Sequence, residues 1–177
     1  MTRSELRFSG FGGQGVITMA HVLGHAASIH AEMSAAMTEA YGPEKTGGFS
    51  RADLVIDDEE IGYPNVVEPD FFVAFSQDAF ERDLVDPSSL LEQWDEREIE
   101  IVTVPAVELA ESVGRKLVAN VVMLGATVEL AGVVPVEDVR NAIRDIVPDG
   151  TERLNERAFD RGRSAIDDVG VEPEVVG

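Results

Sequence analysis

Hydrophobic and polar residues near the start of the chain follow two successive periods. Residues 6–9 alternate between apolar and polar side chains, which is the pattern of a short β-strand. From residue 16 to residue 29 the apolar side chains recur every three or four positions, which predicts a helix. A glycine-rich segment, residues 10–15, lies between them. A strand, a tight turn and a helix in this order form the opening of a β–α–β unit.

The rest of the chain continues this alternation and then becomes helical. Apolar runs bounded by turn residues predict strands at 33–38, 52–56, 71–75 and 99–104. Helices are expected from a Ser76 cap to residue 84, from Pro105 onward, over 117–130 with a break at Gly125, over 135–147 and over 151–166.

The order of these elements defines the fold class as α/β. We expect a Rossmann-like, mainly parallel sheet with helices on both faces and a helical C-terminal third. Residues 1–166 are expected to form a single α/β domain, and residues 167–177 a polar C-terminal tail.

Charge changes the picture more than any other feature of composition. The 177 residues include 34 acidic and 14 basic side chains, for a formal net charge of −20. Such a surface repels phosphates and anionic lipids, so nucleic acid and membranes are not expected partners. The acidity fits either a partner-binding face or adaptation to high salt. Because the acids are spread along the whole chain and only Lys45 and Lys116 are lysines, the salt interpretation is favoured.

Several classes of chemistry are excluded or disfavoured. Without cysteine the chain can hold no disulfide, catalytic thiolate or cysteine-ligated iron–sulfur cluster. No apolar run approaches the roughly 18 residues of a membrane span, and the N-terminus lacks the apolar segment of a signal peptide, so a cytoplasmic location is expected. His21 and His25 would share a helix face, but no acidic or third ligand is placed to complete a metal site, so no metal site is predicted.

The glycine-rich segment matches a phosphate-binding fingerprint. Gly10, Gly12 and Gly15 have the spacing G-x-G-x-x-G, and the segment lies between a strand and a helix, as that fingerprint requires. One glycine permits the tight turn, one lets a ligand approach the backbone, and one allows close packing of the helix on the strand. A purely structural turn remains the alternative. A nicotinamide site would also need an acid after the second strand; Glu39 is near that position, but it abuts a second glycine loop.

Four motifs in order give a resemblance to a known family. They are the segments 10–16, 41–48, 61–64 and 120–126. Together they resemble the gamma subunits of 2-oxoacid:ferredoxin oxidoreductases, within the pyruvate/ketoisovalerate oxidoreductase catalytic-domain family, and the 2-oxoglutarate type more than the pyruvate type. An indolepyruvate oxidoreductase beta-type subunit and a free-standing nucleotide-binding regulatory module remain alternatives. The sequence departs from the family at residues 83–98, where the usual glycine-led strand is missing and one sheet strand is in doubt.

The resemblance implies a role within a larger enzyme. Such enzymes decarboxylate a 2-oxoacid oxidatively, form acyl-coenzyme A and reduce ferredoxin, with thiamine diphosphate and iron–sulfur clusters as redox cofactors. This chain has no thiamine diphosphate signature, so both cofactors are expected on partner subunits, alpha and beta, with delta as a further candidate. Ferredoxin would be an indirect partner. No catalytic residue is expected in this chain, which would not be catalytic alone.

The same resemblance and the glycine fingerprint define a candidate coenzyme A site at a subunit interface. Backbone N–H groups and the Gln14 amide would meet phosphate, and Lys45 would add a cation or remain a solvated loop lysine. Glu44 would orient the loop or pair with a partner subunit. Asn120 and Gly125 are expected to be structural, packing on the second loop or on a neighbouring subunit. The predicted site residues are Gly10, Gly12, Gly13, Gln14, Gly15, Tyr41, Gly42, Pro43, Glu44, Lys45, Gly47 and Gly48.

Overall fold

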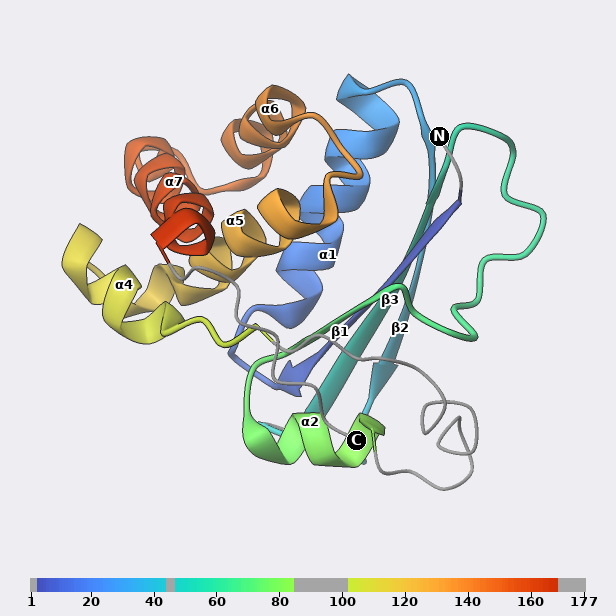
Figure 1. Ribbon diagram of the computed structural model, residues 1–177, viewed down its shortest axis with the longest axis horizontal. Coiled ribbons are helices and arrows are strands. Elements are labelled where there is room, and N and C mark those ends of the chain that lie inside the picture. Colours follow the sequence, from blue (N-terminus) through green and yellow to red (C-terminus); the bar gives the residue numbers. More distant parts are fainter. Residues whose placement is uncertain (1–2, 44–46, 85–101, 169–177) are drawn as a thin grey trace.

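The computed structural model describes residues 3–43, 47–84 and 102–168 (Figure 1). Its strands are β1 (Ser4–Phe11), β2 (Ser34–Tyr41), β3 (Phe49–Asp57) and β4 (Phe71–Ala74). Its helices are α1 (Val16–His25), the π-helix η1 (Ala26–His30), α2 (Gln77–Leu84), α4 (Ala106–Val113), the 3₁₀-helix η2 (Lys116–Val118), α5 (Ala119–Ala131), α6 (Val136–Ile146) and α7 (Glu152–Asp168). The α/β class and the helical C-terminal third are confirmed.

The strands form one sheet in the order β2-β3-β1-β4. β1 runs parallel to β4, but β3 is antiparallel to both β1 and β2. β1, β2 and β4 therefore point the same way, and β3 runs against them. The expected mainly parallel pairing is wrong for this reason, since two of the three strand pairs are antiparallel.

The length of one connection explains the mixed sheet. Residues 42–48 alone join β2 to β3, whereas a parallel crossover needs about a dozen residues or more. β3 must therefore return beside β2 as a hairpin, and it takes the place next to β1. The longer segment between β1 and β2 contains α1 and η1 and makes the crossover of the β–α–β unit.

One expected strand differs from the structure. Residues 102–104, the described part of the 99–104 segment, lie in no strand, and 99–101 lie outside the described residues. Most of the 83–98 region that departs from the family pattern also lies outside them, as does the tail from residue 169.

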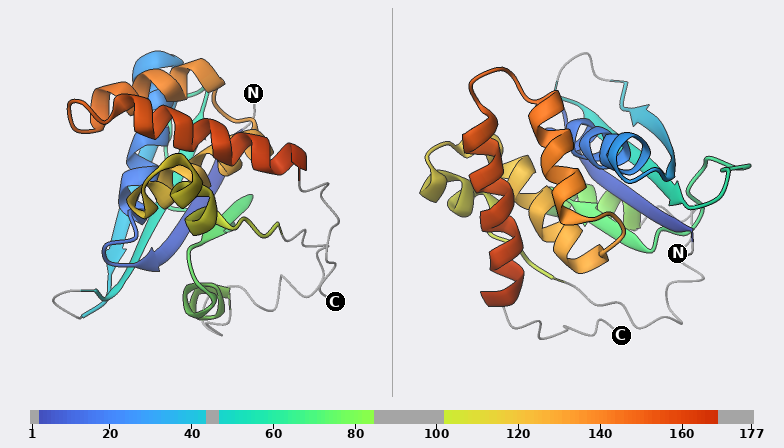
Figure 2. Two further views of the ribbon diagram at one scale, coloured as in Figure 1. Left: turned by 90° about the vertical axis from the view of Figure 1, so that its left-hand side faces the viewer. Right: turned by 90° about the horizontal axis from the view of Figure 1, so that it is seen from above.

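Helices cover both faces of the sheet, as expected. α1 packs on one face, and α4 to α7 form a layer behind it (Figures 1 and 2). The other face of β1 and β4 carries Arg7 and Phe72, and the Phe72 ring stacks on Phe80 of α2. The connection between β3 and β4 crosses this same face, where the carbonyl of Val66 accepts a hydrogen bond from Arg7.

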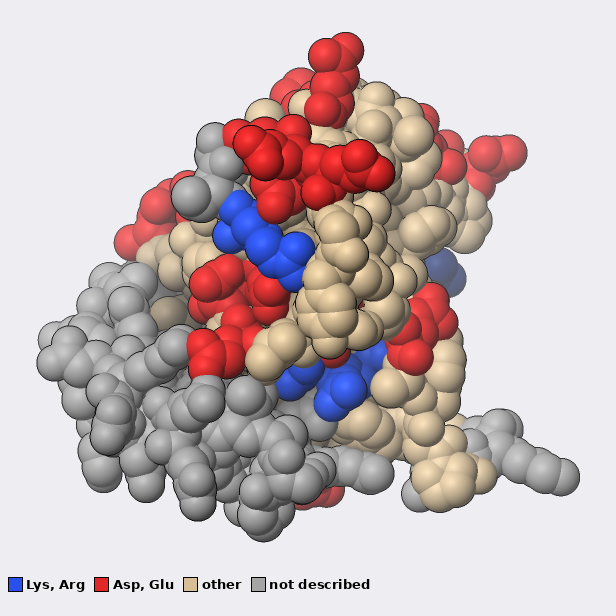
Figure 3. Space-filling model, turned by 90° about the vertical axis from the view of Figure 1, so that its right-hand side faces the viewer, with Lys and Arg blue, Asp and Glu red and all other residues tan. Residues whose placement is uncertain are grey.

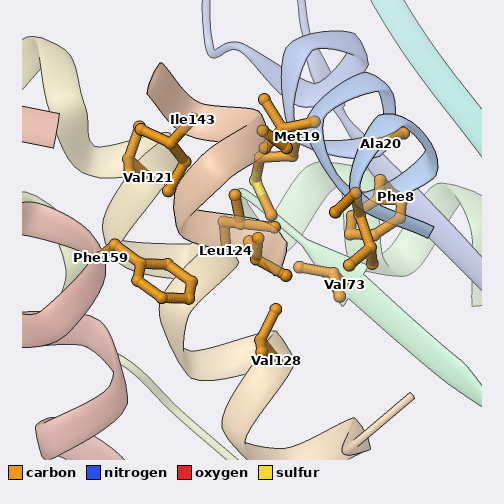
Figure 4. Packing of buried hydrophobic residues seen from close by; sticks show 14 of the residues in the cluster. Phe8, Met19, Ala20, Val73, Val121, Leu124, Val128, Ile143 and Phe159 are labelled. Carbon is orange, nitrogen blue, oxygen red and sulfur yellow. The ribbon is translucent and has the colours of Figure 1, made fainter. Parts of the chain in front are cut away.

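The hydrophobic core lies between the sheet and the C-terminal helices. Phe8 and Val73 of the sheet are buried with Met19 of α1, and Leu124 of α5 and Phe159 of α7 continue the cluster outward (Figure 4). At roughly 25 cal/mol per Å² of buried apolar surface, each of the larger, fully buried side chains among them contributes about 2–3 kcal/mol. This core fixes α1, and with it the turn that precedes α1, on the sheet.

The crossing of α5 and α7 depends on two glycines. A Cβ atom added to Gly125 would collide with the carbonyl oxygen of Phe159, and one added to Gly162 would collide with the carbonyl oxygen of Val122. The expected break at Gly125 is wrong: α5 continues through it. The missing side chain instead lets the two helix backbones touch.

Candidate functional site

The glycine turn between β1 and α1 uses backbone conformations that favour glycine. Gly13 has φ 90° and Gly15 has φ 78°, both in the left-handed region. Gly15 is the N-cap of α1, where no side chain caps the helix, and no acidic residue lies in the first turn. The first N–H groups of α1 thus have no side-chain acceptor in the turn, and the positive end of the helix dipole is not neutralised by a neighbouring carboxylate.

Gln14 stabilises the turn through two hydrogen bonds to the backbone of Phe11. Its side-chain oxygen Oε1 accepts a hydrogen bond from the Phe11 N–H at 2.7 Å, and its own N–H donates to the Phe11 carbonyl at 3.1 Å. A Cβ atom on Gly10 would lie only 2.6 Å from that Oε1, so the folded-back amide requires glycine there. The amide oxygen of Gln14 is thus committed to the turn, and its nitrogen is the part left for a ligand.

The second glycine loop lies directly beside the turn. The Gly12 N–H donates to the Gly48 carbonyl at 2.7 Å, and a Cβ atom on Gly12 would come within 3.2 Å of Gly47 Cα. Gly47 has φ 69°, again in the left-handed region. The structure therefore brings the glycine turn and the second glycine loop together, with glycine where their backbones meet.

The second loop is the tip of the β2–β3 hairpin, which projects from the body of the molecule (Figure 2). The Gly42 N–H closes the base of the loop on the Phe49 carbonyl at 2.7 Å. Tyr41 and Pro43 are exposed. The Tyr41 hydroxyl donates to the Glu39 carboxylate, and this hydrogen bond, with a smaller effect of burial, raises the pKa of Tyr41. Glu44 and Lys45 lie outside the described residues.

Two further residues border the turn and were not placed there by sequence reasoning. A Cβ atom on Gly15 would lie 2.5 Å from Asn120 Nδ2, so the Asn120 side chain packs on the turn itself. Phe75 follows β4, where its N–H donates to the Ser9 carbonyl and its Cβ lies near Gly10. Both contacts link segments distant in sequence, and no local pattern reveals them.

A fourth motif of the family resemblance lies elsewhere. Residues 61–64 belong to the connection between β3 and β4, and the Tyr63 carbonyl accepts a hydrogen bond from Arg3 at 2.8 Å. Arg3 directly precedes β1, whereas the glycine turn follows it. This motif therefore lies at the opposite end of β1 from the candidate site.

These contacts leave groups at the turn whose chemistry suits an anion. The site offers backbone N–H groups, an amide nitrogen and a helix N-terminus, and the described residues bordering it include no nucleophile paired with a general base. Among the described residues, no helix combines the length and apolarity needed to cross a membrane.

Comparison with known proteins assigns the class. The family model described as "Pyruvate ferredoxin/flavodoxin oxidoreductase" matches residues 5–165, and the chain belongs to this family. The chain is 46% identical to the 2-oxoglutarate synthase subunit KorC of Methanothermobacter marburgensis over 180 residues, which cover 93% of this chain and 97% of the relative.

Solved structures agree with this assignment. The gamma subunit of a keto/oxoacid ferredoxin oxidoreductase from Geobacter sulfurreducens superposes with a TM-score of 0.74 and 32% identity, over 91% of this chain and 96% of that chain. The 2-oxoglutarate:ferredoxin oxidoreductase from Magnetococcus marinus, solved with 2-oxoglutarate, coenzyme A and succinyl-CoA bound, has the same fold in part of its chain. Its TM-score is 0.78 and its identity 19%, over 99% of this chain and 33% of that chain. The resemblance seen in the four sequence motifs is confirmed, and the relatives are subunits of 2-oxoacid oxidoreductases.

Proposed function

We propose that this chain is the gamma-type subunit of a 2-oxoglutarate:ferredoxin oxidoreductase. The similarity to a 2-oxoglutarate synthase subunit over nearly the whole of both chains supports the substrate, as does the Tyr-Gly-Pro-Glu motif at residues 41–44. In this reaction 2-oxoglutarate loses carbon dioxide, its remaining acyl group is joined to coenzyme A, and ferredoxin takes up the electrons. A free-standing regulatory module is not favoured, because the relative that spans this chain is named as an enzyme subunit.

The redox cofactors belong to other subunits in this proposal. The chain has no cysteine to hold an iron–sulfur cluster and no Gly-Asp-Gly segment followed by asparagine to hold thiamine diphosphate. Asp149 and Gly150 are part of the turn that connects α6 to α7 and do not form that signature. The residues of this chain are thus left with binding and positioning tasks.

We assign to the glycine turn the task of holding a phosphate of coenzyme A. The observation that supports it is the uncapped N-terminus of α1 beside the second glycine loop, joined by the Gly12–Gly48 hydrogen bond. In a protein of net charge −20, an anion-binding surface needs a place free of carboxylates, and the first turn of α1 has none. The Magnetococcus enzyme with bound coenzyme A contains the same fold, which is consistent with this task.

The same end of the molecule is proposed to dock the alpha and beta subunits, and a delta subunit where one is present. Tyr41 is 65% exposed and Leu117 78% exposed. Tyr41 lies across from Ser50, which pairs with Gly10, and Leu117 precedes Asn120 by one helical turn. Exposed large apolar side chains on both sides of a binding turn fit a surface that a partner covers, so coenzyme A would bind between subunits.

The test uses the assembled enzyme with Gly12→Val in this chain. The added side chain would push the second loop away, and losing hydrogen bonds to a charged phosphate should raise the KM for coenzyme A about tenfold or more. The KM for 2-oxoglutarate should not change, because that substrate reacts on a partner subunit. Gly62→Val is the matched control, since a Cβ atom at Gly62 meets nothing within 4 Å.

The possible outcomes separate the two tasks of the site. An unchanged KM for coenzyme A in a fully assembled Gly12→Val enzyme would contradict coenzyme A binding. Loss of copurification with the partner subunits, with the isolated chain still folded, would instead assign Gly12 to docking. Copurification of the native chain with no thiamine- or cluster-bearing partner would contradict the subunit assignment itself.

We further propose that the acidic surface is an adaptation to high salt. Figure 3 shows one face of the molecule, the side of the sheet opposite α1, and on it the carboxylates of the described residues lie at several separate places. In the helical layer on the other side of the sheet, carboxylates form ion pairs with arginines, such as Asp160 with Arg140 and Glu129 with Arg163. A dispersed excess of carboxylates is better suited to concentrated salt than to one docking face.

A further inference from the structure

Two of the three histidines of the chain converge on one carboxylate. His25 Nε2 lies 3.2 Å and His30 Nε2 lies 2.8 Å from the same oxygen, Asp145 Oδ2. His21 stands next to them, with its ring 6.5 Å from the ring of His25, but is not among the converging ligand atoms. The sequence pattern paired His21 with His25 and offered no third ligand; in the structure the pair is His25 with His30, and α6 supplies Asp145 as the third group.

A local irregularity of the helix puts the two histidines on one side. In a regular α-helix, residues five positions apart point about 140° away from each other, because each turn takes 3.6 residues. His25 and His30 have this separation, but they bracket the π-turn η1, where the Ala31 N–H donates to the carbonyl of Ala26. The wider turn brings residues five apart back to the same face. π-turns within helices occur frequently at functional sites.

The spacing of the ligand atoms matches a transition-metal site. Zinc lies about 2.0–2.2 Å from imidazole nitrogen and carboxylate oxygen, so neighbouring ligand atoms stand about 2.9–3.4 Å apart in octahedral or tetrahedral geometry. The two observed nitrogen–oxygen distances, 3.2 and 2.8 Å, are close to this range, and all three atoms lie within 4.8 Å of one another. We propose that His25, His30 and Asp145 bind a divalent first-row transition-metal ion such as Zn²⁺, with water in the remaining positions.

The chemistry of the ligands selects the class of ion. Two imidazoles with one carboxylate suit zinc, nickel or copper, whereas magnesium and calcium prefer oxygen ligands throughout. The side chains are 27%, 22% and 48% exposed for His25, His30 and Asp145, so an ion reaches them from solvent without opening the fold. Both ring nitrogens lie against the same oxygen, Asp145 Oδ2. A cation bound to all three atoms would therefore replace both hydrogen bonds at once.

The ion would join two parts of the fold. His25 ends α1 and His30 ends η1, while Asp145 lies in the last turn of α6. A bound ion would thus fasten the C-terminal end of α1 to the helical layer, at the far end of α1 from the glycine turn. All three ligand groups belong to this chain and none comes from the glycine turn, so the site can be tested on the full-length chain alone.

The experiment is a calorimetric titration of the full-length chain with ZnCl₂, in molar KCl and excess MgCl₂ so that the acidic surface is already occupied. One equivalent of Zn²⁺ should bind with saturation. His30→Ala and Asp145→Asn should each weaken binding at least about tenfold, because each removes a ligand. His21→Ala, on the same helix but outside the three-ligand group, should leave the affinity unchanged. Zn²⁺ should also raise the melting temperature of the parent chain and of His21→Ala only.

The proposal is overturned if the parent chain shows no saturable Zn²⁺ binding under these conditions. It is equally overturned if both His30→Ala and Asp145→Asn bind Zn²⁺ as tightly as the parent, or if His21→Ala weakens binding as much as they do. Circular dichroism confirms that each variant is folded, and the exposed, nearly isosteric Asp145→Asn keeps the test decisive should His30→Ala fail to fold.

Discussion

The side chain of Asn120 packs on the backbone of Gly15, so that a Cβ atom on Gly15 would lie 2.5 Å from Asn120 Nδ2. This contact joins the N-cap of α1 to the start of α5. It connects two motifs that lie far apart in the sequence, and it makes the C-terminal helical layer a wall of the glycine turn. The position of the turn therefore depends on α5 as well as on β1.

Replacing Gly15 with alanine should lower the free energy of unfolding by about 2–5 kcal/mol. Left-handed strain on a non-glycine residue accounts for about 1–2 kcal/mol, and overpacking against Asn120 for about 1–3 kcal/mol. Gly13→Ala is the matched control, because Gly13 also has positive φ but its Cβ would meet nothing within 4 Å. Urea unfolding should show a smaller loss for Gly13→Ala than for Gly15→Ala.

Adding Asn120→Ala to Gly15→Ala should recover part of the loss. Removing the Asn120 side chain relieves the collision but not the strain at Gly15, so the two changes should couple by about 0.5–3 kcal/mol. Strictly additive effects in the double variant would show that the two residues do not press on each other.

The strand, glycine turn and helix at the start of the chain were predictable because their signals are local. The period of the apolar residues changes from two to about 3.6 on either side of the Gly10–Gly15 turn, and glycine marks the positions of positive φ. The place of β3 between β2 and β1 is a non-local pairing. Its signal was nevertheless present, since residues 42–48 are too short for a parallel crossover.

Other features could not be predicted, because they depend on contacts between segments that are distant in the sequence. Gly125 resembles a helix breaker in a sequence, and only the crossing with α7 shows that it serves as a contact. The π-turn η1 has no sequence marker that we recognise, so the approach of His30 to His25 could not be foreseen. Asp145 meets them only through the packing of α6 on η1.

Gly125→Ala or Gly162→Ala should be among the most destabilising small substitutions in the chain. Each added methyl group would collide with a backbone carbonyl of the facing helix, which cannot move aside as a side chain can, and should cost about 3 kcal/mol or more. Gly24→Ala in α1 is the control, since its Cβ would meet only the end of the Leu54 side chain.

Thermal melting followed by circular dichroism measures these differences. Alanine has higher helix propensity than glycine by about 1 kcal/mol, so Gly24→Ala should melt near or above the parent. A Gly125→Ala variant that also gained stability would mean that α5 and α7 do not cross as closely as the structure shows.

Removing one partner of the buried Arg7–Asp53 ion pair, which lies on the face of the sheet opposite α1, should strongly lower the free energy of unfolding. Arg7 donates to both carboxylate oxygens of Asp53 at 2.8 and 2.9 Å, and both side chains are about 7% exposed. Asp53→Ala leaves the guanidinium buried without its carboxylate, which should lower the free energy of unfolding by about 3–5 kcal/mol. Asp160→Ala, which removes the half-exposed partner of Arg140, should cost less than about 1 kcal/mol.

The combined Arg7→Leu and Asp53→Leu variant should lose less stability than the sum of its single changes, because no isolated charge then remains in the interior. Urea unfolding of the four proteins of this cycle measures the coupling. Equal losses for Asp53→Ala and Asp160→Ala would contradict the burial of the first pair.

The net charge of −20 predicts a melting temperature that rises with salt. Carboxylates spread over one surface repel one another, and raising KCl from low to molar concentration shortens the screening length from tens of ångströms to about 3 Å. The folded chain, which holds these charges close together, should gain more from screening than the unfolded chain. A melting temperature that stays flat or falls along the KCl series would contradict salt adaptation. Repeating the KCl series on the assembled enzyme then tests the alternative, that the acidity serves to bind a partner. The partner would neutralise such an acidic face on assembly, so the melting temperature of the complex would not depend on KCl.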